Sequence, residues 1–418
     1  MNAPSPSNRH VTVIGAGAVG MATALQLLRD GYRVTVVDKD EPGQGCSFGN
    51  AGILAPTYCV PLSMQGTVWN VPGWLLDPLS PLSIRWRDFV SLLPWFLRFT
   101  LAGSRSRAEA SSKSLRTLHE NCVRDFQSFF ESIGAAHLIK PTGMIYAYES
   151  ERNYQKSAGD WELIRKRGAR AEVLDAKQIQ EMVPGISPAC SHGIHLPEDG
   201  QVTSPLKIVE TLADEFRRHG GTILKRDIAD IEIGADGPSR LLNDGDALEI
   251  DTLVIAAGAH SANLCKRLGH AVPLVGERGY HVTLPEPGLR MAMPVMSGDC
   301  KFAMTSMEMG LRAAGTAEFA SLNAPPNYGR AQVLLTHLKR IFPSINTDGY
   351  SEWMGMRPSL PDSLPVIGAS PRFPSTYFAF GHGNAGLMGS VITGRTIADL
   401  ISGRTPALDP TPFRVDRF

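Results

Sequence analysis

The sequence predicts a mixed fold, α/β plus α+β, in which a parallel-sheet nucleotide-binding domain is interleaved with an antiparallel-sheet domain. Three observations predict it. A strand, a glycine turn, a helix and a second strand follow one another near the N-terminus, glycine-bearing segments follow two later hydrophobic strands, and two further stretches alternate apolar and polar residues. We expect the nucleotide-binding domain at 1–60, 201–272 and 346–418, and the second domain at 61–200 and 273–345.

The first element is a β-branched strand, Val11–Ile14, followed by glycines that fit G-x-G-x-x-G and by a helix that ends at Gly31. This is the arrangement of a Rossmann-like unit, in which the glycines allow a tight turn, close approach of a pyrophosphate and close helix packing. Asp38 ends the second strand, where a carboxylate accepts hydrogen bonds from ribose hydroxyls, which favours NAD or FAD over NADP. The predicted contacts are Gly15, Ala16, Gly17, Ala18, Val19, Gly20, Asp38 and Lys39.

Three small-residue segments favour a flavin over a nicotinamide nucleotide. The stretch 41–56 is rich in glycine and proline, so it forms an ordered loop where a nicotinamide enzyme would have a helix. A strand at 250–255 runs into Ala256–Gly258, and a strand near 378 runs into a glycine loop and then a helix that we expect to start near Ala385. Its positive end would stabilise negative charge on a flavin. The predicted contacts are Cys46, Ser47, Asn50, Ala51, Gly52, Ile53, Ala257, Gly258, Gly383, Asn384, Ala385, Gly386, Leu387 and Met388.

The motifs GAGAVG, CSFGNAG, VIAAG, GMRPSLPDSLPVIG and GHGNAGLMGS together resemble the D-amino acid oxidase superfamily of FAD enzymes. Within it, the chain is most similar to the bacterial D-amino acid dehydrogenases of the small-subunit type, which include D-hydroxyproline dehydrogenases. The resemblance implies noncovalent FAD, although a thioether to Cys46 is an alternative, and a backbone contact of Ile228 with the adenine.

Substrate chemistry is assigned first to Arg357, because a planar guanidinium grips a carboxylate through two hydrogen bonds. In the resembled family an arginine in the same G-x-R-P stretch has this role; the alternative is an arginine that only holds its loop through carbonyls or Asp362. Tyr280 is a second candidate for the carboxylate, and packing is its alternative. We expect His281 on the opposite face of that strand and Arg312 paired with Glu318 or another acid. His382 either tunes flavin charge or bonds the backbone.

The resemblance implies oxidative deamination of D-amino acids, D-proline and cis-4-hydroxy-D-proline among them, by hydride transfer to flavin N5, with a quinone or other electron acceptor. One alternative is an oxidase or dehydrogenase of glycine, sarcosine or another secondary amine. Another is a flavin-bearing subunit of an electron-transfer complex. A nicotinamide dehydrogenase is disfavoured because CSFGNAG and GHGNAGLMGS would have no role.

Composition restricts partners and location. The chain has 41 basic and 41 acidic residues and no basic run, which argues against nucleic-acid binding. Six scattered cysteines without metal-like spacing favour reduced thiols and a cytoplasmic location. Met1–Asn8 reads as a frayed tail rather than a signal peptide. The apolar, tryptophan-bearing region 73–103 is read mainly as core, with a peripheral membrane contact as the alternative.

Overall fold

The computed structural model describes residues 9–64, 67–235, 237–243 and 246–418, so the tail predicted for Met1–Asn8 lies outside it. The chain divides into two compact units that interleave in the sequence. The first contains the residues up to Phe48, Leu206–Val275 and Arg357–Phe418, and the second contains Gly49–Pro205 and Gly276–Met356. Residues 49–60, 201–205 and 346–356, which we assigned to the nucleotide-binding domain, therefore belong to the second unit, and 273–275 belong to the first.

The first unit is built on a six-stranded sheet with the order β10-β2-β1-β14-β21-β20. All neighbouring strands pair in parallel except β20, which is antiparallel to β21. Such a sheet is covered on both faces, and β1, β2 and β14 are accordingly almost wholly buried. The strands are β1 (His10–Ile14), β2 (Arg33–Asp38), β10 (Thr222–Lys225), β14 (Thr252–Ile255), β20 (Val366–Ala369) and β21 (Thr376–Phe380).

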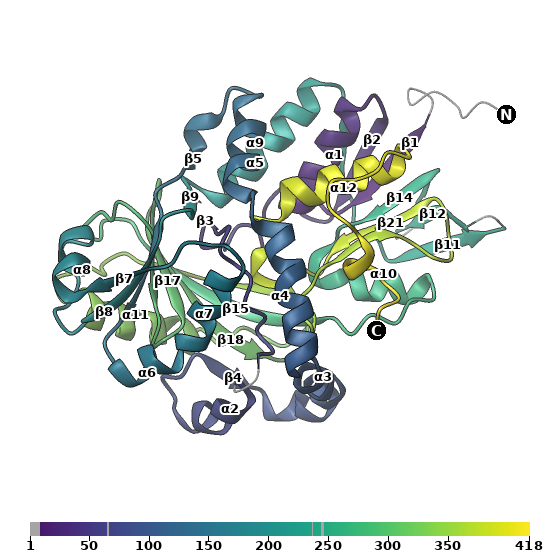
Figure 1. Ribbon diagram of the computed structural model, residues 1–418. Coiled ribbons are helices and arrows are strands. Elements are labelled where there is room, and N and C mark those ends of the chain that lie inside the picture. Colours follow the sequence, from purple (N-terminus) through teal and green to yellow (C-terminus); the bar gives the residue numbers. More distant parts are fainter. Residues whose placement is uncertain (1–8, 65–66, 236, 244–245) are drawn as a thin grey trace. The chain divides into compact units, whose positions relative to one another are not determined.

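Two helices of this unit, α1 (Ala18–Arg29) and α12 (Ser390–Ile401), lie side by side (Figure 1). Gly394 permits this, because a Cβ there would lie 2.8 Å from the backbone of Ala22 and Thr23. Ser204 followed by Pro205 predicts the start of a helix, and the chain forms α9 (Pro205–Arg218) there. The unit also holds α10 (Ser261–Arg267) and a small sheet of β11 (Asp230–Gly234), β12 (Gly237–Leu242) and β13 (Ala247–Glu249).

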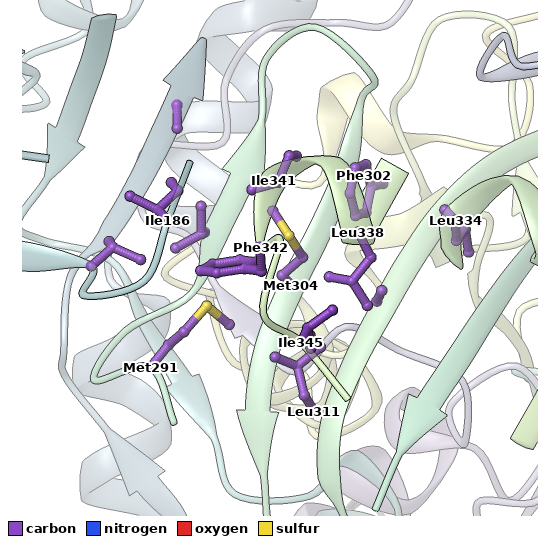
Figure 2. Packing of buried hydrophobic residues seen from close by; sticks show 14 of the residues in the cluster. Ile186, Met291, Phe302, Met304, Leu311, Leu334, Leu338, Ile341, Phe342 and Ile345 are labelled. Atoms are coloured by element: carbon purple, nitrogen blue, oxygen red, sulfur yellow. The ribbon is translucent and has the colours of Figure 1, made fainter. Parts of the chain in front are cut away.

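The second unit contains the predicted antiparallel strands, in a nine-stranded sheet with the order β19-β15-β18-β17-β16-β6-β8-β7 and β4 beside β18. Phe302, Met304 and Leu311 on one face of this sheet pack against Leu334, Leu338 and Ile341 of one helix (Figure 2). That helix is α11 (Gly329–Ile341). The strands are β4 (Leu82–Ile84), β6 (Met144–Tyr148), β7 (Glu172–Asp175), β8 (His192–Leu196), β15 (Val275–Leu284), β16 (Val295–Ser297), β17 (Phe302–Met307), β18 (Gly310–Phe319) and β19 (Ser351–Ser359).

One helix prediction in this unit is wrong. The sequence around Ser111–Gly134 predicts one long amphipathic helix, but the chain forms α4 (Arg105–His119) and α5 (Cys122–Glu131). The break lies at Asn121, the N-cap of α5, whose backbone has φ −110° and ψ 6°, outside the α-helical region. The remaining elements are β3 (Ile53–Leu54), α2 (Thr67–Leu76), α3 (Phe89–Ala102), β5 (Ile139–Lys140), α6 (Glu151–Lys156), α7 (Ala158–Lys166), α8 (Ala176–Met182) and β9 (Gly200–Val202).

Candidate cofactor and substrate site

The predicted cofactor residues of the first unit all follow the carboxyl ends of parallel strands. Gly15–Gly20 follow β1, Asp38 ends β2, Ile228 comes after β10, Ala257 and Gly258 follow β14, and Gly383–Met388 follow β21. Because carboxyl ends of parallel strands share one edge of the sheet, these segments gather at that edge. Ligands of open α/β sheets bind at this edge.

The glycine turn after β1 has room only for glycine at two positions. Gly15 has φ +114°, and a Cβ there would lie 2.3 Å from the carbonyl oxygen of Ala256. A Cβ at Gly20 would lie 1.9 Å from the carbonyl oxygen of Gly15. Gly17 is the N-cap of α1, so the turn leads directly into the helix N-terminus. The result is a close backbone cradle at a helix N-terminus, which suits a phosphate group.

Asp38 and Ser47 are brought to the same turn. The Asp38 carboxylate accepts the backbone N–H of Ala16 at 2.6 Å, and the Ser47 hydroxyl accepts that of Ala18 at 3.0 Å. Lys39 is exposed and Asp38 half-buried. Asp38 therefore ends β2 as predicted, and it also fixes the glycine turn by a charge-assisted hydrogen bond, a role that the motif alone did not indicate.

The glycine loop after β21 differs from its prediction. We expected a helix from about Ala385, but Gly383–Ala385 form a single 3₁₀ turn and α12 begins only at Ser390. Gly383 has φ +57°, which is outside the helical region. The buried His382 contacts the Thr393 hydroxyl through Nε2 at 2.9 Å, so it ties the loop to α12. The positive N-terminal end of the predicted helix is therefore at Ser390 and not at Ala385.

Arg357 lies on β19 and is half-buried. The alternative role that we considered, holding the loop through Asp362, is filled by another residue. Arg417 grips the Asp362 carboxylate with Nε at 2.8 Å and Nη2 at 3.3 Å, and Nη2 also donates to the carbonyl of Leu364. Arg417 thus holds Asp362, and for Arg357 the substrate carboxylate stays the predicted ligand, with backbone carbonyls of the loop as the alternative.

Tyr280 lies in the core of the second unit. It is fully buried, its hydroxyl donates to Glu318 at 2.5 Å and it accepts the backbone N–H of Asn327 at 2.9 Å. Burial raises the pKa of Tyr280 to about 12, so the phenol stays protonated. Both hydrogen-bonding roles of the hydroxyl are taken, which argues against its predicted role as a ligand of the substrate.

Arg312 also differs from its prediction. The carboxylate of Glu318 lies 3.5 Å from Arg278, not beside Arg312. Strict alternation would put Arg312 and Glu318, six residues apart on β18, on the same face. The register shift between β15 and β18 at Arg278–Tyr280 turns Glu318 toward Tyr280 instead, whereas Leu311 and Ala313 join the core below α11 and Arg312 faces the other side of the sheet. On that side it lies opposite Thr283 of β15 and Thr305 of β17, with Nε 3.4 Å from the Thr283 hydroxyl.

The loop Asn50–Ile53, which we predicted to contact the flavin, is held by hydrogen bonds within the second unit. The Asn50 side chain accepts the N–H of Gly52 at 2.8 Å, the Val202 N–H donates to the Gly52 carbonyl at 2.7 Å, and Ile53 pairs with Gln201. Gly52 has φ +72°, and a Cβ there would lie 2.7 Å from Met307. The loop is thus ordered, as its composition predicted. His281 and Arg312, which sequence reasoning left outside the site, lie against it.

Six cysteines are free thiols, Cys46 half-buried among them. In the described part of the chain no group of histidine, cysteine and acidic side chains has the arrangement of a metal site. Over the same residues, every helix is too short or too polar to cross a membrane.

These residues fit a dinucleotide. The cradle of Gly15 and Gly20 gives the close backbone approach that a pyrophosphate needs, and the carboxylate of Asp38 stands at the end of the neighbouring strand. The geometry of the first unit thus agrees with a bound nucleotide at the edge predicted from the sequence.

Known proteins support this assignment over nearly the whole chain. Residues 10–400 match the family model described as FAD dependent oxidoreductase (DAO). A protein of Bradyrhizobium diazoefficiens named D-amino-acid oxidase is 36% identical over 99% of this chain and 100% of its own length. A protein of Paramagnetospirillum magneticum named D-amino acid dehydrogenase is 31% identical over 98% of both chains.

Solved structures show the same fold. Glycine oxidase from Geobacillus kaustophilus has a TM-score of 0.76 at 21% identity and covers 98% of this chain and 100% of its own. L-Proline dehydrogenase from P. horikoshii has a TM-score of 0.75 at 18% identity, covering 99% and 98%. These matches agree with the glycine turn after β1 and with Asp38 at the end of β2. The chain belongs to the DAO family of FAD-dependent oxidoreductases, with FAD as its cofactor.

Proposed function

We propose that the protein oxidises D-amino acids at the α-carbon and that the imine product hydrolyses to a 2-oxo acid and ammonia. With a cyclic secondary amine such as D-proline or cis-4-hydroxy-D-proline, the product would be a pyrroline carboxylate. One observation carries the proposal: relatives that match the chain over almost its full length are named D-amino-acid oxidase and D-amino acid dehydrogenase.

Arg357 provides the substrate contact in this proposal. Its guanidinium holds the carboxylate of the amino acid through two charge-assisted hydrogen bonds, which fixes the direction of the α-carbon. FAD, when bound, supplies the two-electron acceptor for the C–H bond. The protein then has to orient the substrate and exclude water, and no side-chain nucleophile is needed.

An anaerobic panel of amino acids tests the proposal. We expect the visible absorbance of the bound flavin to bleach with one or more D-amino acids and not with their L-enantiomers. Acid precipitation should release the FAD into the supernatant, because we propose that it is noncovalently bound.

Bleaching by glycine or sarcosine alone would replace the proposed substrate class with that of a simple amine. No bleaching by any amino acid, in a protein that holds FAD, would favour a flavin-bearing subunit that serves a partner's site.

We further propose that the electron acceptor is a quinone or an electron-transfer protein.

We also propose that the helix α3 makes a peripheral contact with an anionic membrane. Val90, Leu93, Leu97 and Leu101 recur on one side of α3 and are 39–74% exposed. Trp95, on the other side, is buried against Phe99 and Phe319. An exposed apolar stripe with cations beside it is typical of a helix that lies on a membrane surface. Four exposed arginines flank the stripe: Arg87, Arg98, Arg105 and Arg107.

Co-sedimentation with vesicles tests this contact. We expect the wild type to bind vesicles that contain anionic lipid. The double variant Leu97→Glu, Leu101→Glu should bind at least tenfold more weakly, because anionic headgroups repel a carboxylate and the membrane–water interface solvates it poorly. Val173→Glu is the matched control, because Val173 is 60% exposed on β7, outside the stripe. Equal binding by the double variant and the wild type would rule the contact out.

A further inference from the structure

Two consecutive backbone carbonyls of the loop Gly49–Ile53 face side chains of the antiparallel sheet. Arg312 donates from Nη1 to the carbonyl of Asn50 at 3.0 Å, and Nδ1 of His281 lies 3.3 Å from the carbonyl of Gly49. Both side chains are 2% exposed. The His281 ring is stacked on Trp353 with centroids 5.1 Å apart, and a Cβ at Gly49 would lie 1.8 Å from that indole. The loop is thus fitted to this face of the sheet.

The direction of these carbonyls determines where the loop's N–H groups point. In a planar trans peptide the C=O of one residue and the N–H of the next point in opposite directions, and the described chain has no cis peptide bond. With the carbonyls of Gly49 and Asn50 turned toward His281 and Arg312, the N–H groups of Asn50 and Ala51 point away from the sheet. The Gly52 N–H is used within the loop, by the Asn50 side chain. The arrangement therefore aims two adjacent backbone donors away from the sheet.

The charges of the two side chains are set by burial. Burial lowers the pKa of Arg312 to about 10, so the guanidinium is still charged at neutral pH. Burial, followed by the charge of Arg312, lowers the pKa of His281 to about 3, so its ring is neutral. A neutral ring that binds a carbonyl through Nδ1 must carry its proton there. Thr305, fully buried on the strand beside Arg312, has a hydroxyl without a hydrogen-bond partner among the described residues.

We infer that Arg312 and His281 are positioning residues: they fix the loop so that the N–H groups of Asn50 and Ala51 donate to the bound FAD. This inference rests on the proposed function, because it takes the loop as part of the flavin site. Two fixed donors stabilise negative charge on a ligand without reorganisation. The arginine is suited to this task, because its fork reaches the Asn50 carbonyl and the Thr283 hydroxyl together.

The test compares Arg312→Met with Arg278→Met in the FAD-loaded enzyme. Arg278 is the matched control: it is a fully buried arginine of the same sheet, and it holds the carbonyls of Ser321, Ala324 and Pro325 instead. We expect Arg312→Met to weaken FAD binding at least tenfold, to change the visible circular dichroism of the flavin and to lower its reduction potential. Arg278→Met should lower the Tm and leave the flavin spectrum and potential as in the wild type.

Conservative variants separate positioning from general damage. His281→Asn keeps an N–H donor near the place of Nδ1 and should retain the wild-type flavin spectrum, whereas His281→Leu should change it. Arg312→Lys, which keeps the charge and loses the fork, should restore the potential more than the FAD affinity. The inference is overturned if Arg312→Met and His281→Leu hold FAD with wild-type affinity, dichroism and potential. A wild type that binds no FAD would instead remove the proposed function itself.

Discussion

Replacing Arg357 with methionine should lower kcat/KM for a D-amino acid about 10³-fold, which corresponds to about 4 kcal/mol of lost binding in the transition state. The size follows from the loss of two charge-assisted hydrogen bonds to a desolvated carboxylate. Steady-state kinetics with an artificial dye acceptor measures it. The FAD content should change little, because Arg417, not Arg357, binds the Asp362 carboxylate in this loop.

A substrate analogue separates this role from a structural one. The amide of the same D-amino acid has no carboxylate, so Arg357→Met should cost little for the amide and much for the acid. Arg357→Lys should recover only part of the activity, because an ammonium group cannot bind both carboxylate oxygens in the same geometry. If acid and amide lose activity equally, Arg357 serves the loop and not the substrate.

Gly15→Ala should abolish copurification of FAD. The alanine would be placed at φ +114°, which costs about 1–3 kcal/mol for a residue with a Cβ. Its Cβ would also lie 2.3 Å from the carbonyl oxygen of Ala256, directly after the paired strand β14, so the backbone would have to shift. Turn and strand must then separate, which displaces the backbone donors that bind the pyrophosphate. The FAD-to-protein ratio and a titration with added FAD measure the loss.

The matched control is Gly159→Ala on α7 of the second unit. A Cβ at Gly159 has no heavy atom within 4 Å, and its φ lies outside the left-handed region. This variant should keep wild-type FAD content and Tm. If Gly15→Ala binds FAD as tightly as Gly159→Ala, the glycine turn is not the pyrophosphate site.

The sequence by itself determined the features that depend on neighbouring residues. The two strands, the glycine turn and the helix predicted within residues 10–38 were confirmed, and Asp38 ends the second strand as predicted. Each of these features depends only on local conformation, such as the positive φ of Gly15 in the turn. The start of α9 at Pro205 and the alternation of Tyr280 and His281 are local in the same sense.

Only the tertiary structure decided which long-range partner each polar side chain takes. Tyr280 and Glu318 meet because their strands pair, and Arg417 binds Asp362 although the two lie 55 residues apart in the sequence. Glu318 was assigned to the wrong arginine because Arg312 is nearer to it in sequence, whereas strand pairing places Arg278 beside it. A charged side chain leaves water only where a specific geometry replaces its hydration. That geometry is made by strand pairing and packing between distant segments. The sequence therefore identifies which side chains can form ion pairs and hydrogen bonds, and the fold determines which of them are partners.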